Sequence, residues 1–395
     1  MTSPVGATSG VKWGQTTRMF TTGRGSGQTA SVSDPDATVP RIVLAAGTAS
    51  GAGTSIALTA ALRGLARLDA DVTAIVARPS TVAAPLSITV RPVGRPTAIL
   101  GELIGRGDAH VYIGFADRLP LVGRGGRHQV LVVQNPHLYQ SPDQGWSVAR
   151  RLKFGVLAMW ARRSLRRADK VVCSTAASRD AVSSASGRPA SGIEVVPIPA
   201  IDIDVTKATQ AELIGRLVVV GDRYPYKRTV DAVDAATEFA ARTDRTIEVT
   251  LVGRDRDAAT EAELDAAITR ATTAGAEVTV LGSVPHARAL AEMAAADVLM
   301  LTSTAETQGI PLVEAHAIGL PVVCREIGAF LDLGGDAVQL VELSGAGTEF
   351  ADALVAIAER SERERLAAAG RVLHPSTDVW QLLSPADLAQ DAARR

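Results

Sequence analysis

The chain of 395 residues is longer than one ordinary domain, so its length indicates two domains of about 150–200 residues each. Lys and Arg total 41 against 42 for Asp and Glu, and this near-neutral balance argues against a dedicated nucleic-acid-binding protein. Two cysteines exclude a disulfide scaffold and fit a reducing cytosol. No stretch of the sequence approaches the roughly 18 apolar residues of a membrane-spanning helix. We therefore expect a globular, cytoplasmic protein with no nucleic-acid partner.

The first 40 residues differ in composition from the rest of the chain. Gly, Ser and Thr make up 19 of them, and the few apolar residues show no periodicity. Such a segment cannot bury enough surface to offset the entropy of ordering it, and it lacks the apolar core of a secretion signal. The composition predicts a disordered tail over residues 1–40 or a wrongly assigned translation start.

From residue 41 onward, short apolar runs alternate with longer stretches of helical periodicity. In the first half we expect helices at 55–67 and 147–167 and buried strands at 42–46, 72–77, 110–115, 129–134 and 170–173. In the second half we expect strands at 217–220, 247–252, 278–281, 298–301 and 321–324, separated by helices at 229–242, 258–274, 286–296 and 311–319. Strand–helix alternation of this kind predicts parallel sheets that are covered on both faces.

The pattern predicts an α/β protein with two Rossmann-like, doubly wound parallel-sheet domains that face a cleft. Prolines and a polar run interrupt the alternation near residues 198–210, where we expect the domains to join. The predicted divisions are a tail at 1–40, an N-terminal domain at 41–203 and a C-terminal domain at 204–370. Residues 371–395 form a predicted tail or helix that could pack back on the N-terminal domain.

Two familiar motifs are only partly present. Gly51 and Gly53 lie in a predicted strand-to-helix turn that resembles a P-loop, but Thr54 stands where the phosphate-binding Lys belongs. This turn either lets the backbone approach a ligand or is a tight turn with no ligand. Asp255 and Asp257 could hold a divalent cation, although acidic pairs are common where helices begin. No His or Cys spacing indicates zinc, and we expect neither a metal nor another cofactor.

The most informative stretch, residues 303–323, begins where a predicted strand ends and opens a helix. Gly309 allows a ligand to approach closely, and Pro311 fits the first turn of the helix. The N-terminus of this helix is a predicted anion site, at which we expect free amides to point outward from Ile310, Leu312 and Val313.

Two carboxylates flank this predicted helix start. Glu314 lies one turn inside the helix, where it suits hydroxyl donors such as a ribose diol. Glu306 precedes the helix and could reach a different part of the same ligand, or it could be an ordinary helix cap.

Cationic side chains follow the predicted strand at 217–220. Arg223, Lys227 and Arg228 come directly after Gly221-Asp222. Because parallel strands end at one edge of a sheet, we expect Arg223 and Lys227 to lie near Gly309. Two cations opposite a helix N-terminus would form a diphosphate site, and the alternative is that both are solvated loop charges.

Together these motifs resemble the family 4 retaining glycosyltransferases, which have the GT-B fold. Glu306 and Glu314 match that family's E-x7-E pair, and residues 221–228 resemble its G-R-L-x-P-x-K-R segment. Shorter matches lie at 168–174, 198–202, 251–253, 280–284 and 296–298. The resemblance covers about residues 41–370 and is most specific in the second half of the chain.

The resemblance implies a role for each matching position. Lys227 would contact the diphosphate of a nucleotide sugar, Glu306 the transferred sugar and Glu314 the ribose. The family's Arg directly follows the Gly, whereas Asp222 stands there in this chain, so either Arg223 or Arg228 would take that role. Backbone and turn contacts to the donor are expected from Gly221, Gly309, Ile310, Pro311 and Leu312, with Gly51 and Gly53 in the first half.

Two features of the first half bear on the acceptor. His137 follows a predicted strand at a place where the family commonly has a His that lines the cleft, so it could contact the sugar or the acceptor, or pack on Pro136. The predicted helix within 147–170 is rich in Arg and amphipathic. Such a helix can lie on an anionic membrane surface, or it can be a solvated face over a core stripe.

The sequence therefore predicts a cytoplasmic, retaining hexosyltransferase, at most peripheral to the inner face of the membrane. Its donor would be a GDP- or UDP-sugar, and its acceptor a hydroxyl of a glycan, a lipid-linked or a small molecule, as in cell-envelope polysaccharide or glycoconjugate synthesis. Two alternatives remain: a non-catalytic scaffold related to glycosyltransferases, and a nucleotide-sugar epimerase with the same fold.

Overall fold

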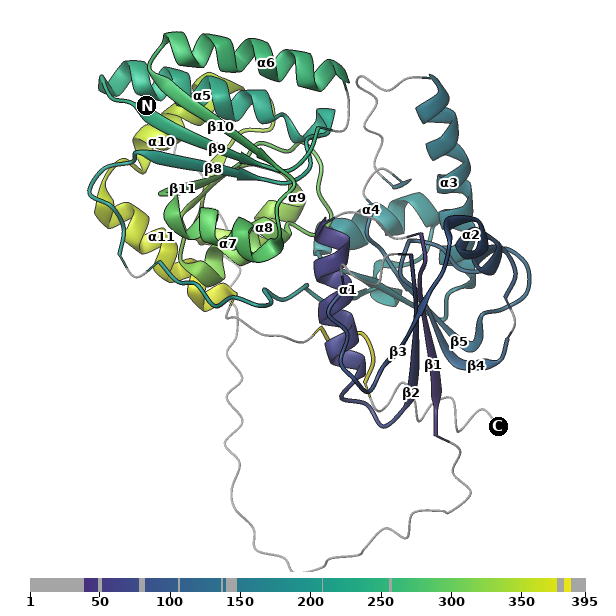
Figure 1. The fold of residues 1–395 in the computed structure, drawn as a ribbon. Coiled ribbons are helices and arrows are strands. Elements are labelled where there is room, and N and C mark those ends of the chain that lie inside the picture. Colours follow the sequence, from purple (N-terminus) through teal and green to yellow (C-terminus); the bar gives the residue numbers. More distant parts are fainter. Residues whose placement is uncertain are drawn as a thin grey trace, which may run out of the picture. The chain divides into compact units, whose positions relative to one another are not determined.

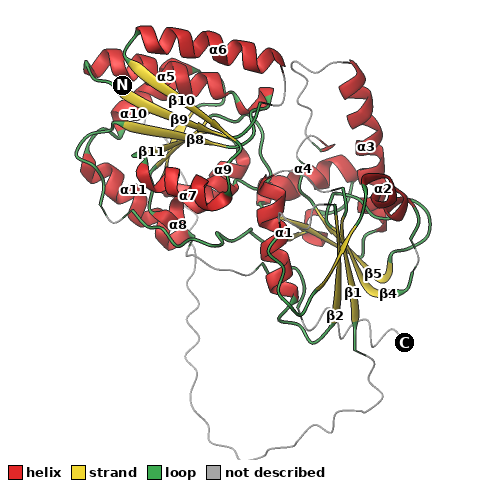
Figure 2. Ribbon diagram, viewed as in Figure 1, coloured by secondary structure: helices red, strands yellow, loops and turns green. Residues whose placement is uncertain are grey.

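The structure is a computed structural model that describes residues 39–48, 52–77, 82–105, 107–135, 138–139, 148–207, 209–255, 258–374 and 380–384. By its contacts the chain divides into Met1–Thr38 and Val39–Arg395, and all described residues belong to the second unit. The predicted tail at 1–40 thus lies almost entirely outside the described residues. Within Val39–Arg395 the chain forms two parallel sheets with helices on both sides of each (Figures 1 and 2).

The first half of the chain forms a seven-stranded sheet of order β3-β2-β1-β4-β5-β6-β7. Its strands are β1 (Arg41–Ala46), β2 (Asp71–Val76), β3 (Thr89–Pro92), β4 (Ala109–Gly114), β5 (Gly126–Val132), β6 (Lys170–Cys173) and β7 (Glu194–Val195). Its helices are α1 (Ala52–Leu65), α2 (Arg95–Leu103), α3 (Val148–Arg167) and α4 (Ala176–Ser186).

The second half repeats this architecture in a six-stranded sheet of order β10-β9-β8-β11-β12-β13. Its strands are β8 (Arg216–Val220), β9 (Ile247–Val252), β10 (Ala276–Gly282), β11 (Val298–Leu301), β12 (Val322–Arg325) and β13 (Val338–Val341). Its helices are α5 (Thr229–Thr243), α6 (Ala258–Thr273), α7 (His286–Ala295), α8 (Ile310–Ile318), α9 (Gly328–Gly334), α10 (Gly347–Ala356) and α11 (Arg360–Leu373).

All strand pairs in the two sheets are parallel, so the predicted α/β fold with two doubly wound sheets is confirmed. In each sheet the strand order reverses once, between β1 and β4 and between β8 and β11. Such a reversal opens a crevice at the carboxyl ends of the strands, where ligands of this fold class bind.

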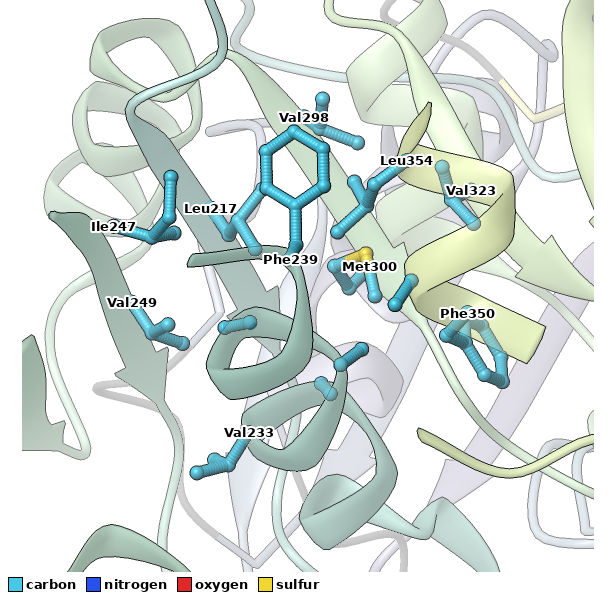
Figure 3. Packing of buried hydrophobic residues seen from close by; sticks show 14 of the residues in the cluster. Leu217, Val233, Phe239, Ile247, Val249, Val298, Met300, Val323, Phe350 and Leu354 are labelled. Atoms are coloured by element: carbon cyan, nitrogen blue, oxygen red, sulfur yellow. The ribbon is translucent and has the colours of Figure 1, made fainter. Parts of the chain in front are cut away.

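Each strand of the second sheet contributes side chains to a core on both faces. Leu217 and Val219 of β8 point into a cluster with α5 and α10, whereas Val218 and Val220 join a cluster with α7, α8 and α9. Figure 3 shows the first cluster, to which α5 contributes Phe239 and α10 contributes Phe350. Burial on both faces explains why β8 reads as a continuous apolar run in the sequence.

The end of the described chain returns to the first half. Trp380 lies in the core cluster of the first sheet, edge to face with Phe115 at 6.1 Å between ring centroids. Its backbone amide donates to the Ala60 carbonyl at 3.1 Å, and its indole Nε1 donates to the Val196 carbonyl at 3.0 Å. The extent of a C-terminal segment at 371–395 and the other predicted domain boundaries stay predictions.

Buried titratable groups occur in the second core. His316 of α8 is buried and stacks on His374 with 5.3 Å between the ring centroids. Burial, followed by the neighbouring His374, lowers the pKa of His316 to about 3.

No helix in the described part of the chain is long and apolar enough to cross a membrane.

Candidate functional site

Two loops at the carboxyl edge of the second sheet form the candidate site. β8 and β11 are neighbours where the strand order reverses, and the loops at 221–228 and 302–309 follow them. Thr302 Oγ1 donates to the Lys227 carbonyl at 2.7 Å, and the Thr304 amide donates to the Tyr226 carbonyl at 2.8 Å. The segments that carry the predicted cations and the predicted sugar-binding Glu are therefore hydrogen-bonded to each other.

Lys227 and Glu306 form an ion pair across these loops. Lys227 Nζ contacts Glu306 Oε1, and the two side chains are 20% and 15% exposed. Ser303 Oγ donates to the same carboxylate oxygen at 3.0 Å, and Lys227 Nζ lies 5.6 Å from the centroid of the Tyr226 ring. Lys227 is thus a held side chain rather than a solvated loop charge, and Glu306 is not a helix cap.

Two glycines allow the strand ends to meet beside this ion pair. Gly221 has a φ of +139°, and a Cβ there would lie 3.7 Å from Lys227 Nζ. A Cβ at Gly253, after β9, would lie 2.1 Å from the Gly221 carbonyl oxygen. Backbone therefore approaches backbone at this edge with no room for side chains.

Gly309 sets the start of α8. Its φ is +55°, and a Cβ there would lie 2.7 Å from Leu333 Cδ1, so both conformation and space favour glycine. The amides of Leu312 and Val313 donate to the Gly309 carbonyl at 2.9 and 3.3 Å. The expectation that these two amides point outward unpaired is therefore wrong, because the carbonyl of Gly309, the N-cap residue, accepts the first hydrogen bonds of the helix.

The remaining predictions for this helix start are partly met. Pro311 occupies the first turn, where its missing N–H breaks no helical bond. Of the three amides expected to be free, that of Ile310 is the one without a hydrogen bond to any described group. The predicted anion site therefore consists of the N-terminus of α8 and the Ile310 amide, and Lys227 lies near it.

Glu314 forms a second polar contact one turn into α8. Its side chain is 3% exposed, and Oε1 lies 2.7 Å from Nε2 of His286, the first residue of α7. Burial alone lowers the pKa of His286, but the hydrogen bond and charge of Glu314 outweigh it, with Asp202 and Asp204 adding to them, so the pKa is raised. His286 is a site residue that the sequence analysis missed.

Arg223 is held by a carboxylate. Its guanidinium makes two hydrogen bonds of 2.6 Å to Asp255, and its side chain is 3% exposed. These hydrogen bonds hold the pKa of Asp255 below its usual range. Arg223 is therefore not a solvated loop charge, and its contact with a diphosphate stays a prediction.

Arg228 also has a carboxylate partner. It donates to Asp231 at 2.8 and 3.2 Å, while the buried Arg325 donates to the same carboxylate at 2.6 Å. Arg325 donates in addition to the Thr302 carbonyl at 2.9 Å. Asp231 and Arg325 thus connect the start of α5 to the loop at 302–309.

Three of the predicted site residues, Gly51, Gly53 and His137, belong to the first half of the chain. Gly51 and His137 lie outside the part of the chain that the structure describes. Gly53 is described, and a Cβ there would lie 3.5 Å from Ile310 Cδ1, so the start of α1 lies close to the start of α8. Pro136, the alternative partner of His137, also lies outside the described residues.

Asp117 marks the corresponding edge of the first sheet and was also missed. Its carboxylate accepts the Gln134 amide at 2.9 Å, the Asn135 amide at 3.4 Å and the Tyr139 hydroxyl at 3.3 Å. Burial raises the pKa of Asp117 to about 6. These contacts fix the two ends of the segment that contains His137.

The loop that carries Glu306 is also hydrogen-bonded to the first half. The Thr307 carbonyl accepts from the hydroxyls of Ser174, Ser178 and Thr175 at 2.6, 3.1 and 3.4 Å. The Thr307 hydroxyl in turn donates to the Gln134 carbonyl at 2.8 Å. No group of three or more His, Cys, Asp or Glu side chains suited to a metal ion occurs within the described ranges.

Comparisons with known proteins found a matching family model and similar solved structures. Residues 215–360 match the family model described as glycosyl transferases group 1, and this segment contains every second-half site residue named above. No curated protein sequence matches the chain.

Solved structures with the same fold are similar over most of the chain. WaaG, a glycosyltransferase involved in lipopolysaccharide biosynthesis, has a TM-score of 0.65 and 17% identity, over 87% of this chain and 97% of WaaG. Anabaena HepE in complex with UDP-glucose has a TM-score of 0.62 and 18% identity, over 90% of this chain and 100% of HepE. Sucrose-phosphate synthase from Thermosynechococcus elongatus has a TM-score of 0.62 and 14% identity, over 90% and 98% of the two chains. The chain therefore has the GT-B fold, and residues 215–360 are similar to the group 1 glycosyltransferases.

Proposed function

We propose that this protein is a retaining glycosyltransferase that moves a hexose from a UDP- or GDP-sugar to a hydroxyl of a glycan, lipid-linked or small-molecule acceptor. The observation that carries the proposal is the Lys227–Glu306 pair at the β8–β11 strand ends, close to the start of α8. UDP is the favoured nucleotide, because the structural neighbour HepE was solved with UDP-glucose. Synthesis of a cell-envelope polysaccharide or glycoconjugate is the setting that the similarity to WaaG favours.

The reaction would break the bond between the anomeric carbon and the diphosphate. The acceptor oxygen would bond to that carbon from the side on which the diphosphate leaves, and the acceptor proton would pass to the departing phosphate. Negative charge then grows on the diphosphate, so a fixed cation and a helix N-terminus stabilise the transition state. Lys227 and the Ile310 amide would supply these two elements, and this step requires no metal ion.

The carboxylates would hold the remainder of the donor. Glu306 would accept hydrogen bonds from sugar hydroxyls. Because Glu306 is ion-paired with Lys227, which would contact the diphosphate, this pair would bind the sugar and the phosphate together. Glu314, fixed by His286 at 2.7 Å, would accept from the ribose hydroxyls.

Nucleotide binding and turnover test these roles. Isothermal titration with UDP, GDP and ADP, followed by hydrolysis or transfer assays with the matching nucleotide sugars, would identify the donor. We expect Lys227→Ala to weaken nucleoside diphosphate binding and to lower turnover by ~10²–10³. Glu306→Ala should lower turnover while nucleoside diphosphate affinity is kept. NMR of the product would show retention of the anomeric configuration.

A matched control separates the loss of a site lysine from the loss of any paired lysine. Lys170 pairs with Glu194 at 2.8 Å and is 15% exposed, but it lies in β6 of the first sheet. Lys170→Ala should leave nucleotide binding unchanged. If no nucleoside diphosphate binds, the scaffold alternative is favoured, and release of an epimerised nucleotide sugar would favour the epimerase.

A further inference from the structure

Helix α3 exposes a stripe of large apolar side chains. Val148, Leu152, Val156 and Met159 are 83%, 71%, 52% and 63% exposed. Their spacing of four, four and three residues places them on one face of the helix. A contiguous apolar face of this kind marks a surface that contacts something other than water.

The opposite face attaches α3 to the first half. Leu165 and Ser164 are buried, and Ser164 Oγ accepts the Leu119 amide at 2.9 Å. Trp160 Nε1 donates to the Leu119 carbonyl at 2.8 Å, and Arg167 donates to the Pro120 carbonyl at 2.7 Å. These contacts come from residues 160–167, whereas the exposed stripe lies at 148–159.

The charges on α3 all have one sign. The helix contains seven cations and no Asp or Glu, the cations being Arg150, Arg151, Lys153, Arg162, Arg163, Arg166 and Arg167. Arg162, Arg163 and Arg166 are exposed and continue the apolar stripe toward the end of the helix. Two further exposed apolar residues, Val122 (64%) and Ile104 (53%), pair with each other next to Leu121, whose carbonyl accepts from Arg163 and Arg167 of α3.

We propose that the exposed face of α3 binds the surface of an anionic lipid bilayer, with the helix axis parallel to the membrane plane. The apolar stripe would enter the boundary between head groups and acyl chains, while the Arg side chains contact lipid phosphates. Charge complementarity favours this occupant, because α3 contains no Asp or Glu to balance the exposed Arg162, Arg163 and Arg166, and the apolar stripe needs an apolar layer beneath it. The inference does not depend on donor chemistry, so it and the proposed function can fail separately.

Vesicle binding by the full-length protein tests the proposal. We expect the protein to sediment with vesicles of phosphatidylcholine mixed with phosphatidylglycerol, to bind phosphatidylcholine vesicles far more weakly, and to be released by added salt. Leu152→Ser combined with Val156→Ser should lower the partition coefficient by at least about tenfold. Arg162→Gln combined with Arg166→Gln should lower it by about thirtyfold, at roughly fivefold for each cation.

Control variants carry the same substitutions elsewhere on the surface. Leu213→Ser with Val372→Ser removes two side chains that are 56% and 81% exposed, and Arg270→Gln with Arg288→Gln removes two exposed cations. Both controls should bind anionic vesicles like the wild type. Because the mutated α3 side chains are exposed, the α3 variants should keep the wild-type melting temperature and nucleotide affinity.

Three results would overturn the proposal. The first is a wild-type protein that does not bind anionic vesicles. The second is an α3 variant that binds as well as the controls do. The third is a wild-type dimer, detected by light scattering, that the Leu152→Ser and Val156→Ser substitutions dissociate, since the stripe would then face a second copy of the chain.

Discussion

Replacing Asp231 by Ala should destabilise the second half of the chain by about 3 kcal/mol. Asp231 lies in the first turn of α5 with 4% of its side chain exposed, and it pairs with Arg325, which is 2% exposed. The substitution leaves the Arg325 guanidinium buried without its carboxylate. Breaking a buried pair by removing one partner costs about 3–5 kcal/mol, because the remaining charge keeps its desolvation penalty.

The contacts that Arg325 keeps place the expected loss at the lower end of this range. Its guanidinium still donates to the carbonyls of Thr302 and Leu343 at 2.9 and 2.8 Å, and to that of Gly345. These acceptors partly compensate the charge. At about 2–4 °C per kcal/mol, the melting temperature of this half should fall by ~6–12 °C.

Asp234 provides a matched control on the same helix. It pairs with Arg270 at 2.8 Å, but the two side chains are 38% and 57% exposed, so Asp234→Ala should cost only ~0.2–1 kcal/mol. Urea unfolding followed by circular dichroism would compare the two variants. Asp231→Asn, which keeps the shape and removes the charge, should still cost more than Asp234→Ala. Equal losses for the two Ala variants, or a loss below ~1 kcal/mol for Asp231→Ala, would refute the reasoning.

Three further predictions concern other parts of the second half and the two thiols. Burial lowers the pKa of His316 to about 3, so the unfolded state takes up a proton on this imidazole at a higher pH than the folded state does. As the pH falls from the usual His pKa to about 5, the free energy of unfolding should therefore decrease by about 2 kcal/mol. In urea titrations, His316→Leu should flatten this dependence of stability on pH. Cys173 and Cys324 are buried with raised pKa values, so an aromatic disulfide reagent should label them only after denaturant is added, and fast labelling of the native protein would contradict this. Gly309→Ala should weaken nucleotide binding and lower the melting temperature, since it adds strain at a φ of +55° and a contact with Leu333, and an unchanged affinity would count against a role for this turn.

The strands that the sequence predicts are all the inner strands of the two sheets and one outer strand, β10, which is largely exposed. All ten predicted strands occur in the structure, and three of them, at 170–173, 247–252 and 298–301, have the predicted bounds. The strands that were missed, β3, β7 and β13, are the other three outer strands of the two sheets. An outer strand needs no long apolar run: β3 is largely exposed and ends in a proline, and β7 has two residues.

The sequence alone indicates that two polar residues of the site lie together only where both belong to the same motif. For the other pairs, the register of the strands in the sheet must be known. Glu306 and Glu314 were found because they share a helix start, but His286 is 28 residues from its partner Glu314. Arg223 and Asp255 are each three residues past the end of a strand, and the register of β8 and β9 pairs Val220 with Val252. That register is the signal that would have identified Asp255 as the partner of Arg223 rather than as a metal ligand.

The hydrogen bonds on Thr307 make the position of Glu306 a property of both halves of the chain. Four hydrogen bonds tie this residue to the first half, and it is adjacent in the chain to Glu306. A ligand that rotates the first half must either break these bonds or carry the Glu306 carboxylate with it. A displacement of ~1 Å can cost about a hundredfold in rate. Under the proposed function, a ligand that moves the first half would therefore change the rate of sugar transfer by displacing the Thr307 peptide and the adjacent Glu306.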